Sequence, residues 1–150
     1  MRNSFLNVIF YLFGLALISA CAVSPVKQDI ELPIQDLNQP LLDEKMVRLV
    51  MYNNSNKLWF GVDGSGEVNI TLDGKGVCRL GNGEYVIVEI FPGDHTFDLE
   101  HRDFVLFKSS YTLSVNEKLT FMQVFATPVS NVAEITEKPE LFEKKYAKVK

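Results

Sequence analysis

The segment Glu84–Glu100, with the sequence EYVIVEIFPGDHTFDLE, carries the clearest fold signal in the chain. Its first half is apolar at successive positions, so both faces of an extended chain would be apolar there, as in a central strand. Its second half alternates, with Phe97 and Leu99 separated by polar residues. The intervening Pro92-Gly93-Asp94 is a turn sequence. We therefore predict two strands joined by a tight turn, Glu84–Phe91 and His95–His101.

Six further runs on either side of this segment are rich in Val, Ile, Phe, Tyr and Thr, the residues favoured in strands. Turn residues separate nearly all of them, at intervals of about 8 to 12 residues and without intervening amphipathic helices. This pattern predicts an all-β chain, an antiparallel β-sandwich of about seven or eight strands, over residues 46–127. The six runs are Met46–Tyr52, Lys57–Val62, Glu67–Leu72, Gly76–Leu80, Phe104–Val115 and Leu119–Phe125.

Residues 128–150 are expected to form a C-terminal extension with one short helix. Lys138-Pro139-Glu140 places a proline and an acid in a first helical turn, and lysines gather at the far end, as the helix dipole prefers. These lysines, at positions 144, 145, 148 and 150, are interpreted as a solvated surface.

Residues 1–20, followed by Cys21, resemble the signal peptide of a bacterial lipoprotein. Arg2 precedes an apolar run, Phe5–Leu17, which is short for the roughly 20 residues of a transmembrane helix. The run is followed by Ile18-Ser19-Ala20-Cys21, which resembles a lipobox. The resemblance implies cleavage between Ala20 and Cys21, fatty acylation of Cys21, and attachment to a membrane. An ordinary secretory signal and an uncleaved anchor helix are the alternatives.

The residue after Cys21 is Ala22 and not Asp. By its likeness to Gram-negative lipoproteins, this implies the outer membrane, with the domain facing the periplasm. Without residues 1–20 the chain keeps 130 of its 150 residues, and without Arg2 it has 14 basic residues against 19 acidic ones, a net charge of −5. Such an acidic chain has no electrostatic footprint for nucleic acid.

Residues 21–45 are predicted to be a lipidated tether. Pro25, Pro33 and Pro40 recur among polar residues without a strand or helix period. A flexible coil of this length spans roughly 25 to 30 Å, and an extended polyproline-like chain about 75 Å. In the alternative, Leu32-Pro33-Ile34 and Leu41-Leu42 dock on the domain.

The chain has two cysteines, so acylation of Cys21 would leave Cys78 without an intramolecular disulfide partner. Cys78 lies with Leu80 on the strand face opposite the charged Arg79, which favours a small buried apolar residue. A reactive thiol or an intermolecular disulfide is the less favoured alternative.

The stretch Val68–Leu99 combines two turn motifs, Asp73-Gly74 and Pro92-Gly93-Asp94-His95. This DG…PGxH pattern resembles PEGA-type domains and, more closely, a bacterial lipoprotein family of unknown function built on that theme. The likeness covers about residues 46–125 together with the lipobox. It implies a transthyretin-like or carboxypeptidase-regulatory-like β-sandwich and transfers no active site. Cys78 departs from the pattern.

No residue pattern in the sequence points to catalysis, a cofactor or a metal. His95 and His101 are the only histidines and would lie roughly 20 Å apart on one strand, too far to share a metal. His95 is expected to bond a neighbouring backbone group, and nothing completes a triad with Asp94. The acidic segment Asp63–Glu67 lacks EF-hand spacing and is interpreted as a plain turn.

Two non-enzymatic functions fit these observations. The first is a lipid-anchored envelope module that contacts a partner protein through an edge strand or a loop. The second is a binding protein for envelope glycan, peptidoglycan or a small ligand, with Trp59-Phe60 and the aromatics of Phe104–Phe107 as its surface. Core packing is the commoner role of such aromatics.

Overall fold

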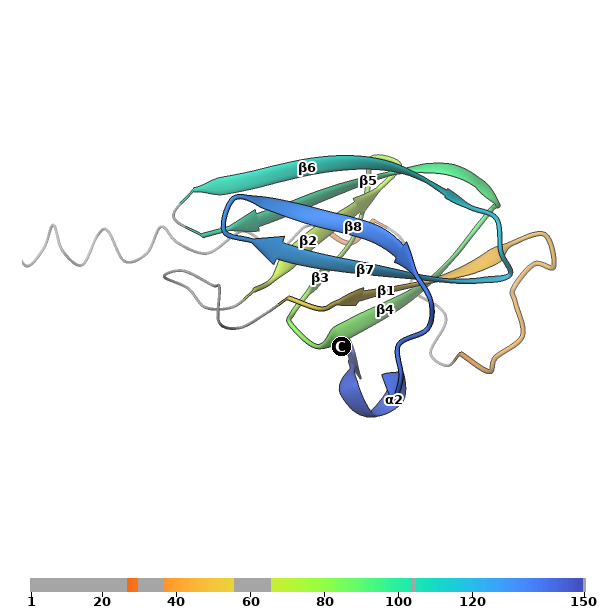
Figure 1. Cartoon of the computed structure of the whole chain (residues 1–150). Helices are drawn as coiled ribbons and strands as arrows, with labels where there is room; N and C mark the ends of the chain where they lie inside the picture. Colours follow the sequence, from red (N-terminus) through yellow and green to blue (C-terminus); the bar gives the residue numbers. More distant parts are fainter. Residues whose placement is uncertain (1–26, 30–36, 56–65, 104, 150) are drawn as a thin grey trace, which may run out of the picture.

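The computed structural model describes residues 27–29, 37–55, 66–103 and 105–149, and these form two packed β-sheets. One sheet has five strands in the order β8-β7-β1-β4-β9, and the other has four in the order β3-β2-β5-β6. Figure 1 shows β6 and β5 of the four-stranded sheet above β8, β7, β1 and β4 of the five-stranded one. The bounds are β1 Val47–Asn53, β2 Val68–Leu72, β3 Lys75–Leu80, β4 Glu84–Ile90, β5 Gly93–Arg102, β6 Leu106–Val115, β7 Leu119–Thr127, β8 Ser130–Thr136 and β9 Ala147–Lys148.

The prediction of an all-β sandwich is confirmed, but its purely antiparallel character is wrong for the larger sheet. There β1 runs parallel to β7, and β4 runs parallel to β9. Alternation of apolar residues indicates which face of a strand is buried. The alternation is the same in parallel and antiparallel strands, so it could not reveal the parallel pairing.

The sheets also continue past Thr127, where the predicted sandwich ended. β8 pairs with β7 along its whole length, and β9 adds a short edge to β4. The segment 128–150 is therefore part of the sandwich as well as the carrier of the helix. β8 was not predicted because it begins with the polar residues Ser130 and Asn131, and because only the inner side of such a strand needs apolar residues. The predicted strand Lys57–Val62 lies outside the described residues.

The main core lies between the sheets, where side chains from both are closed to solvent. Strand β1 differs from the others because all seven of its residues are buried. Its inner side faces the other sheet, and its outer side is covered by the C-terminal helix α2, Phe142–Lys145. The short helix predicted near the C-terminus is thus present and packs on the sandwich, but its predicted start is wrong, because it begins at Phe142 and leaves Pro139 and Glu140 outside its first turn.

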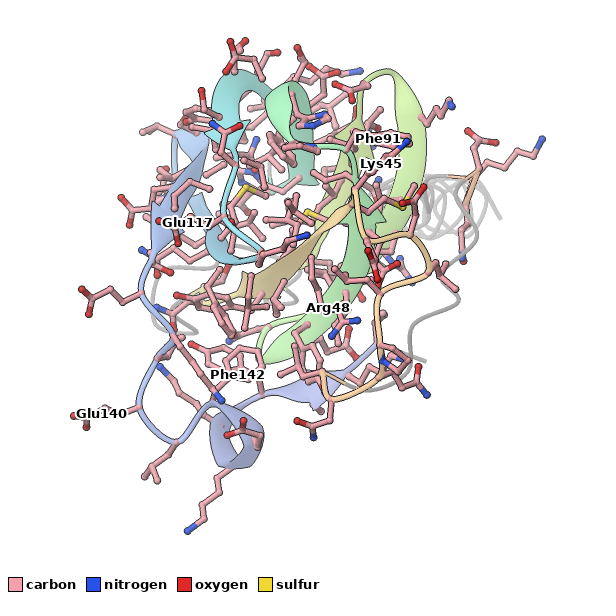
Figure 2. The ribbon with its side chains drawn as sticks, turned by 90° about the vertical axis from the view of Figure 1, so that its right-hand side faces the viewer. Lys45, Arg48, Phe91, Glu117, Glu140 and Phe142 are labelled. Atoms are coloured by element: carbon pink, nitrogen blue, oxygen red, sulfur yellow. The ribbon has the colours of Figure 1, made fainter. Side chains whose placement is uncertain are left out.

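An aromatic cluster makes this outer contact, and Phe142 is its centre. The Phe142 ring is fully buried and meets Tyr52 edge-on at a centroid distance of 5.7 Å and Phe121 edge-on at 5.2 Å. It stacks on Tyr146 at 5.1 Å. Such pairs add about 0.5–1.5 kcal/mol each beyond the area they bury. Figure 2 shows Phe142 on the helix beneath the sheet.

Candidate functional site

The residues of the two turn motifs come together at one end of the four-stranded sheet. Asp73 and Gly74 form the two-residue turn between β2 and β3, with φ of 49° and 75°. Positive φ at both positions defines a type I′ turn, which favours Asp-Gly. The Asp73 carboxylate accepts hydrogen bonds from the Thr96 backbone N–H at 2.9 Å and from the His95 ring at 2.7 Å.

His95 bridges the two turns. Its Nδ1 lies 2.7 Å from Asp73 Oδ2, and its Nε2 lies 2.8 Å from the carbonyl oxygen of Phe91, immediately before Pro92 and Gly93. Both partners are acceptors only, so both ring nitrogens must donate, which requires the imidazolium form. The prediction that His95 bonds a neighbouring backbone group is confirmed, and its ring also joins the two turns.

This geometry shifts the pKa of both groups. Burial lowers the pKa of His95, but its hydrogen bonds to Asp73 and to the Phe91 carbonyl outweigh burial, and the net pKa is raised. Burial raises the pKa of Asp73, but the hydrogen bonds from His95 and Thr96 outweigh it, and the net pKa is lowered. The cluster therefore holds an ion pair that fastens turns together, which is a structural role.

A second polar cluster lies on the outer side of the five-stranded sheet and holds the chain that precedes β1. Arg48 of β1 and Glu89 of β4 are cross-strand neighbours and form an ion pair of 2.9 Å, with side chains only 8% and 2% exposed. The Arg48 guanidinium also donates to the carbonyl oxygens of Leu37 at 2.5 Å and Gln39 at 2.8 Å. The second Glu89 oxygen accepts the Leu42 backbone N–H at 2.8 Å. Figure 2 shows Arg48 beside this segment.

We call Arg48 and Glu89 the clamp. Its hydrogen bonds to Leu37, Gln39 and Leu42 all go to backbone atoms of the preceding segment. Leu37 adds a packing contact to the aromatic cluster around Phe142. The sequence does carry a signal for the clamp, since Arg48 and Glu89 are single charged residues inside otherwise apolar strands. Their position did not by itself indicate that they pair with each other.

The described part of the predicted tether is thus docked and does not form a free coil. Besides the clamp, the Asp29 N–H donates to the Gly76 carbonyl at 2.8 Å, and the Gly76 N–H donates to the Asp29 carboxylate at 3.3 Å. Of the predicted pair, Leu41 is half-buried and Leu42 is 69% exposed. Leu42 contacts the domain through its backbone N–H, which donates to Glu89. Leu32-Pro33-Ile34 lies outside the described residues.

The remaining candidates are placed in the core or outside the described chain. Cys78 is free and buried, and burial raises the pKa of its thiol to about 12, as does the nearby Glu84 carboxylate. It is therefore a protonated packing residue.

His101 is 4% exposed, bonds Asn131 at 2.5 Å and stacks on Phe107 at 5.0 Å, so Phe107 belongs to the core side. Trp59-Phe60, Phe104, Asp63–Ser65, Ala20 and Cys21 lie outside the described residues.

Within the described ranges, no group of three His, Cys, Asp or Glu side chains could hold a metal ion. The same part of the chain has no helix long and apolar enough to span a membrane. Comparison with protein-family models, with curated proteins and with solved structures found no match in any of the three. The resemblance to PEGA-type domains stays a prediction.

The Asp73–His95 pair gives a prediction about pH. The raised pKa of His95 stabilises the fold fully below its unfolded pKa of about 6.5, and this is lost as pH rises through the folded value. The lowered pKa of Asp73 stabilises above its unfolded value near 3.9, and this is lost as pH falls through the folded one. The Asp73 side chain is half exposed, so solvent screening limits the effect.

We expect His95→Gln to cost about 0.5–1 kcal/mol at pH 5.5, and we expect the difference from wild type to shrink as pH approaches 9. Urea unfolding of both proteins at each pH measures it. A difference that grows with pH would contradict the imidazolium assignment.

The clamp gives a prediction about stability. Glu89→Ala leaves a buried guanidinium without its counterion, which typically costs about 3–5 kcal/mol. The control is Glu67→Ala, which breaks the Arg79–Glu67 pair of 3.0 Å, whose side chains are about one-third exposed. That change should cost at most about 1 kcal/mol. Equal losses of unfolding free energy in the two variants would show that the clamp is no stronger than a surface pair.

Proposed function

We propose that this protein is a lipid-anchored, non-enzymatic lipoprotein of the cell envelope, attached through Cys21 to the outer membrane and facing the periplasm. Its β-sandwich serves as an interaction module for a partner protein. The lipobox supports the anchor, and the docked N-terminal segment supports a close coupling between anchor and domain.

The docked segment changes the reach expected of the anchor. If Asp29 is held on Gly76, only the eight residues from Cys21 to Gln28 separate the lipid from the first contact with the domain. At no more than about 3.4 Å per residue, these span at most roughly 27 Å. The domain then works near the membrane surface, whereas a free tether of residues 21–45 would reach much further.

The open edge of β6 carries the proposal of a protein partner. β6 is a ten-residue strand at the end of its sheet, and its pairing with β5 runs without a register shift. Among the described residues, its backbone makes no backbone–backbone hydrogen bond beyond those to β5. At its first half, however, Asn131 of β8 donates to the Phe107 carbonyl at 3.2 Å and to the Ser109 hydroxyl at 3.2 Å, so the part of the edge proposed for strand addition begins at Ser110. Its exposed side chains are small or uncharged except Lys108, which is itself paired with Glu100. Long edge strands without bulges, proline or free charge readily accept another strand.

Metabolic labelling with a radioactive fatty acid tests the anchor. We expect label on the wild-type chain and on Cys78→Ser, and none on Cys21→Ser. Cys78→Ser is the matched control because it removes the only other cysteine. Label that persists in Cys21→Ser, or that disappears only in Cys78→Ser, would contradict acylation at Cys21.

Charge placed on the β6 edge tests the partner contact. Thr112→Lys should reduce recovery of a crosslinked partner from intact cells at least about fivefold, because an edge lysine obstructs strand addition. Thr71→Lys is the control, since Thr71 lies on the same sheet in β2, which is paired on both sides. Both variants must keep the wild-type melting temperature. Equal recovery from Thr112→Lys and wild type would exclude the β6 edge.

A further inference from the structure

The outer face of the four-stranded sheet contains a polar depression that neither of the two turns nor the clamp uses. Its volume is about 500 Å³, within the usual range for small-molecule sites. Two cross-strand rows line it, each with one residue from β2, β5 and β6. The rows are Asn69–Glu100–Lys108 and Thr71–Asp98–Ser110.

The register explains why these six side chains share one surface. Residues opposite each other on paired strands project from the same face, and so do residues two apart on one strand. Ile70 and Leu99, which lie between the rows, are buried in the core. The rows therefore point outward, and the side chains of Thr71, Asp98 and Ser110 are shorter than Glu100 and Lys108 in the neighbouring row.

The second row supplies hydrogen-bonding capacity that the fold does not consume. Within the described chain, the carboxylate of Asp98 has no hydrogen bond or ion pair, and neither have the hydroxyls of Thr71 and Ser110. Asp98 and Ser110 are exposed, and Thr71 is half-buried. In the first row, by contrast, Lys108 pairs with Glu100 at 2.8 Å, which neutralises the one cation of the depression.

We propose that this depression binds the hydroxyl groups of a neutral sugar ring. A carboxylate can accept two hydroxyl hydrogens, and the flanking threonine and serine hydroxyls can each donate and accept. Adjacent hydroxyls on a sugar ring offer the complementary donors and acceptors. Asn69, which is 7% exposed, adds a largely buried amide at the margin of the hollow.

The charges argue against the main alternatives. The lining carries Asp98 and Glu100 against Lys108, so it disfavours phosphate and other anions. All six outward side chains are polar, which disfavours a lipid tail or an aromatic ligand. The site also differs from the glycan surface suggested by the aromatics, because Phe107 stacks on the buried His101.

Saccharide titration of the full-length protein tests the proposal. The protein is held in a zwitterionic, sugar-free detergent, because alkyl glycosides would compete. Calorimetry with maltotriose and chitotriose should show saturable one-site binding, whereas glucose 6-phosphate and spermidine should show none. Absence of saturation with both trisaccharides up to about 20 mM, or binding of spermidine or the phosphate alone, would overturn it.

Substitutions then locate the binding. Asp98→Asn keeps the shape of the side chain and removes its charge, and we expect it to weaken saccharide binding about tenfold. Ser110→Ala should weaken it by a smaller factor. The control is Glu117→Gln, which removes a carboxylate from the β6–β7 turn, outside the lining of the depression. Equal affinities of Asp98→Asn and Glu117→Gln would place the sugar elsewhere.

Two readouts keep these outcomes separate from protein folding and from the partner contact. Each variant must unfold at the wild-type temperature, so that a loss of binding reports the site. Partner recovery through the β6 edge should be unchanged in Asp98→Asn, because that side chain lies on β5, inside the sheet. Loss of sugar binding and loss of the partner are therefore independent results.

Discussion

The burial of β1 on both of its faces is the constraint on which the rest of this structure depends. A strand that is closed to solvent on one side needs only a second sheet, and the four-stranded sheet supplies it. β1 also needs a cover on its outer side, where Val50 and Tyr52 lie in the aromatic cluster. The two ends of the described chain provide that cover. Residues after β8 bring Phe142, and residues before β1 bring Leu37 and the backbone held by Arg48.

Two buried amides within this frame are hydrogen-bonded in a way that favours one arrangement. Asn53 at the end of β1 donates to the carbonyls of Gly66 at 2.7 Å and Leu80 at 2.9 Å and accepts the Ser55 N–H at 2.9 Å. On the other side of the sandwich, Asn131 of β8 bonds His101 and the Phe107 carbonyl across the sheets. A buried amide without these partners would cost about 1–3 kcal/mol, so each residue favours this packing over a shifted one.

Sequence patterns revealed what depends on local order and missed what depends on distant pairing. Continuous apolar residues gave β4, and strict alternation gave β2 and β5, because one buried face leaves a period of two. The contact of His95 with a backbone group of its own turn could be predicted because the Phe91 carbonyl is only four residues away. The parallel pairing of β1 with β7 joins segments about 70 residues apart, and no local period encodes it. The clamp pairs charges 41 residues apart, so each appeared only as an isolated polar residue in an apolar run.

The strand order also relates the proposed anchor to the two proposed contact surfaces. Asp29 is bound to Gly76 on β3, which is one edge of the four-stranded sheet, and the open strand β6 is the other edge. Strands lie about 4.8 Å apart, so three intervals separate these edges by roughly 14 Å. With lipid on Cys21, the chain leads from the membrane to β3 and its contact occupies part of that edge. β6 is then the edge remote from the attachment, and the polar depression lies between the two. Under these two proposals the sheet is attached at one edge and meets its partner at the opposite one, beyond the part of β6 that Asn131 contacts, an arrangement that a freely moving tether would not impose.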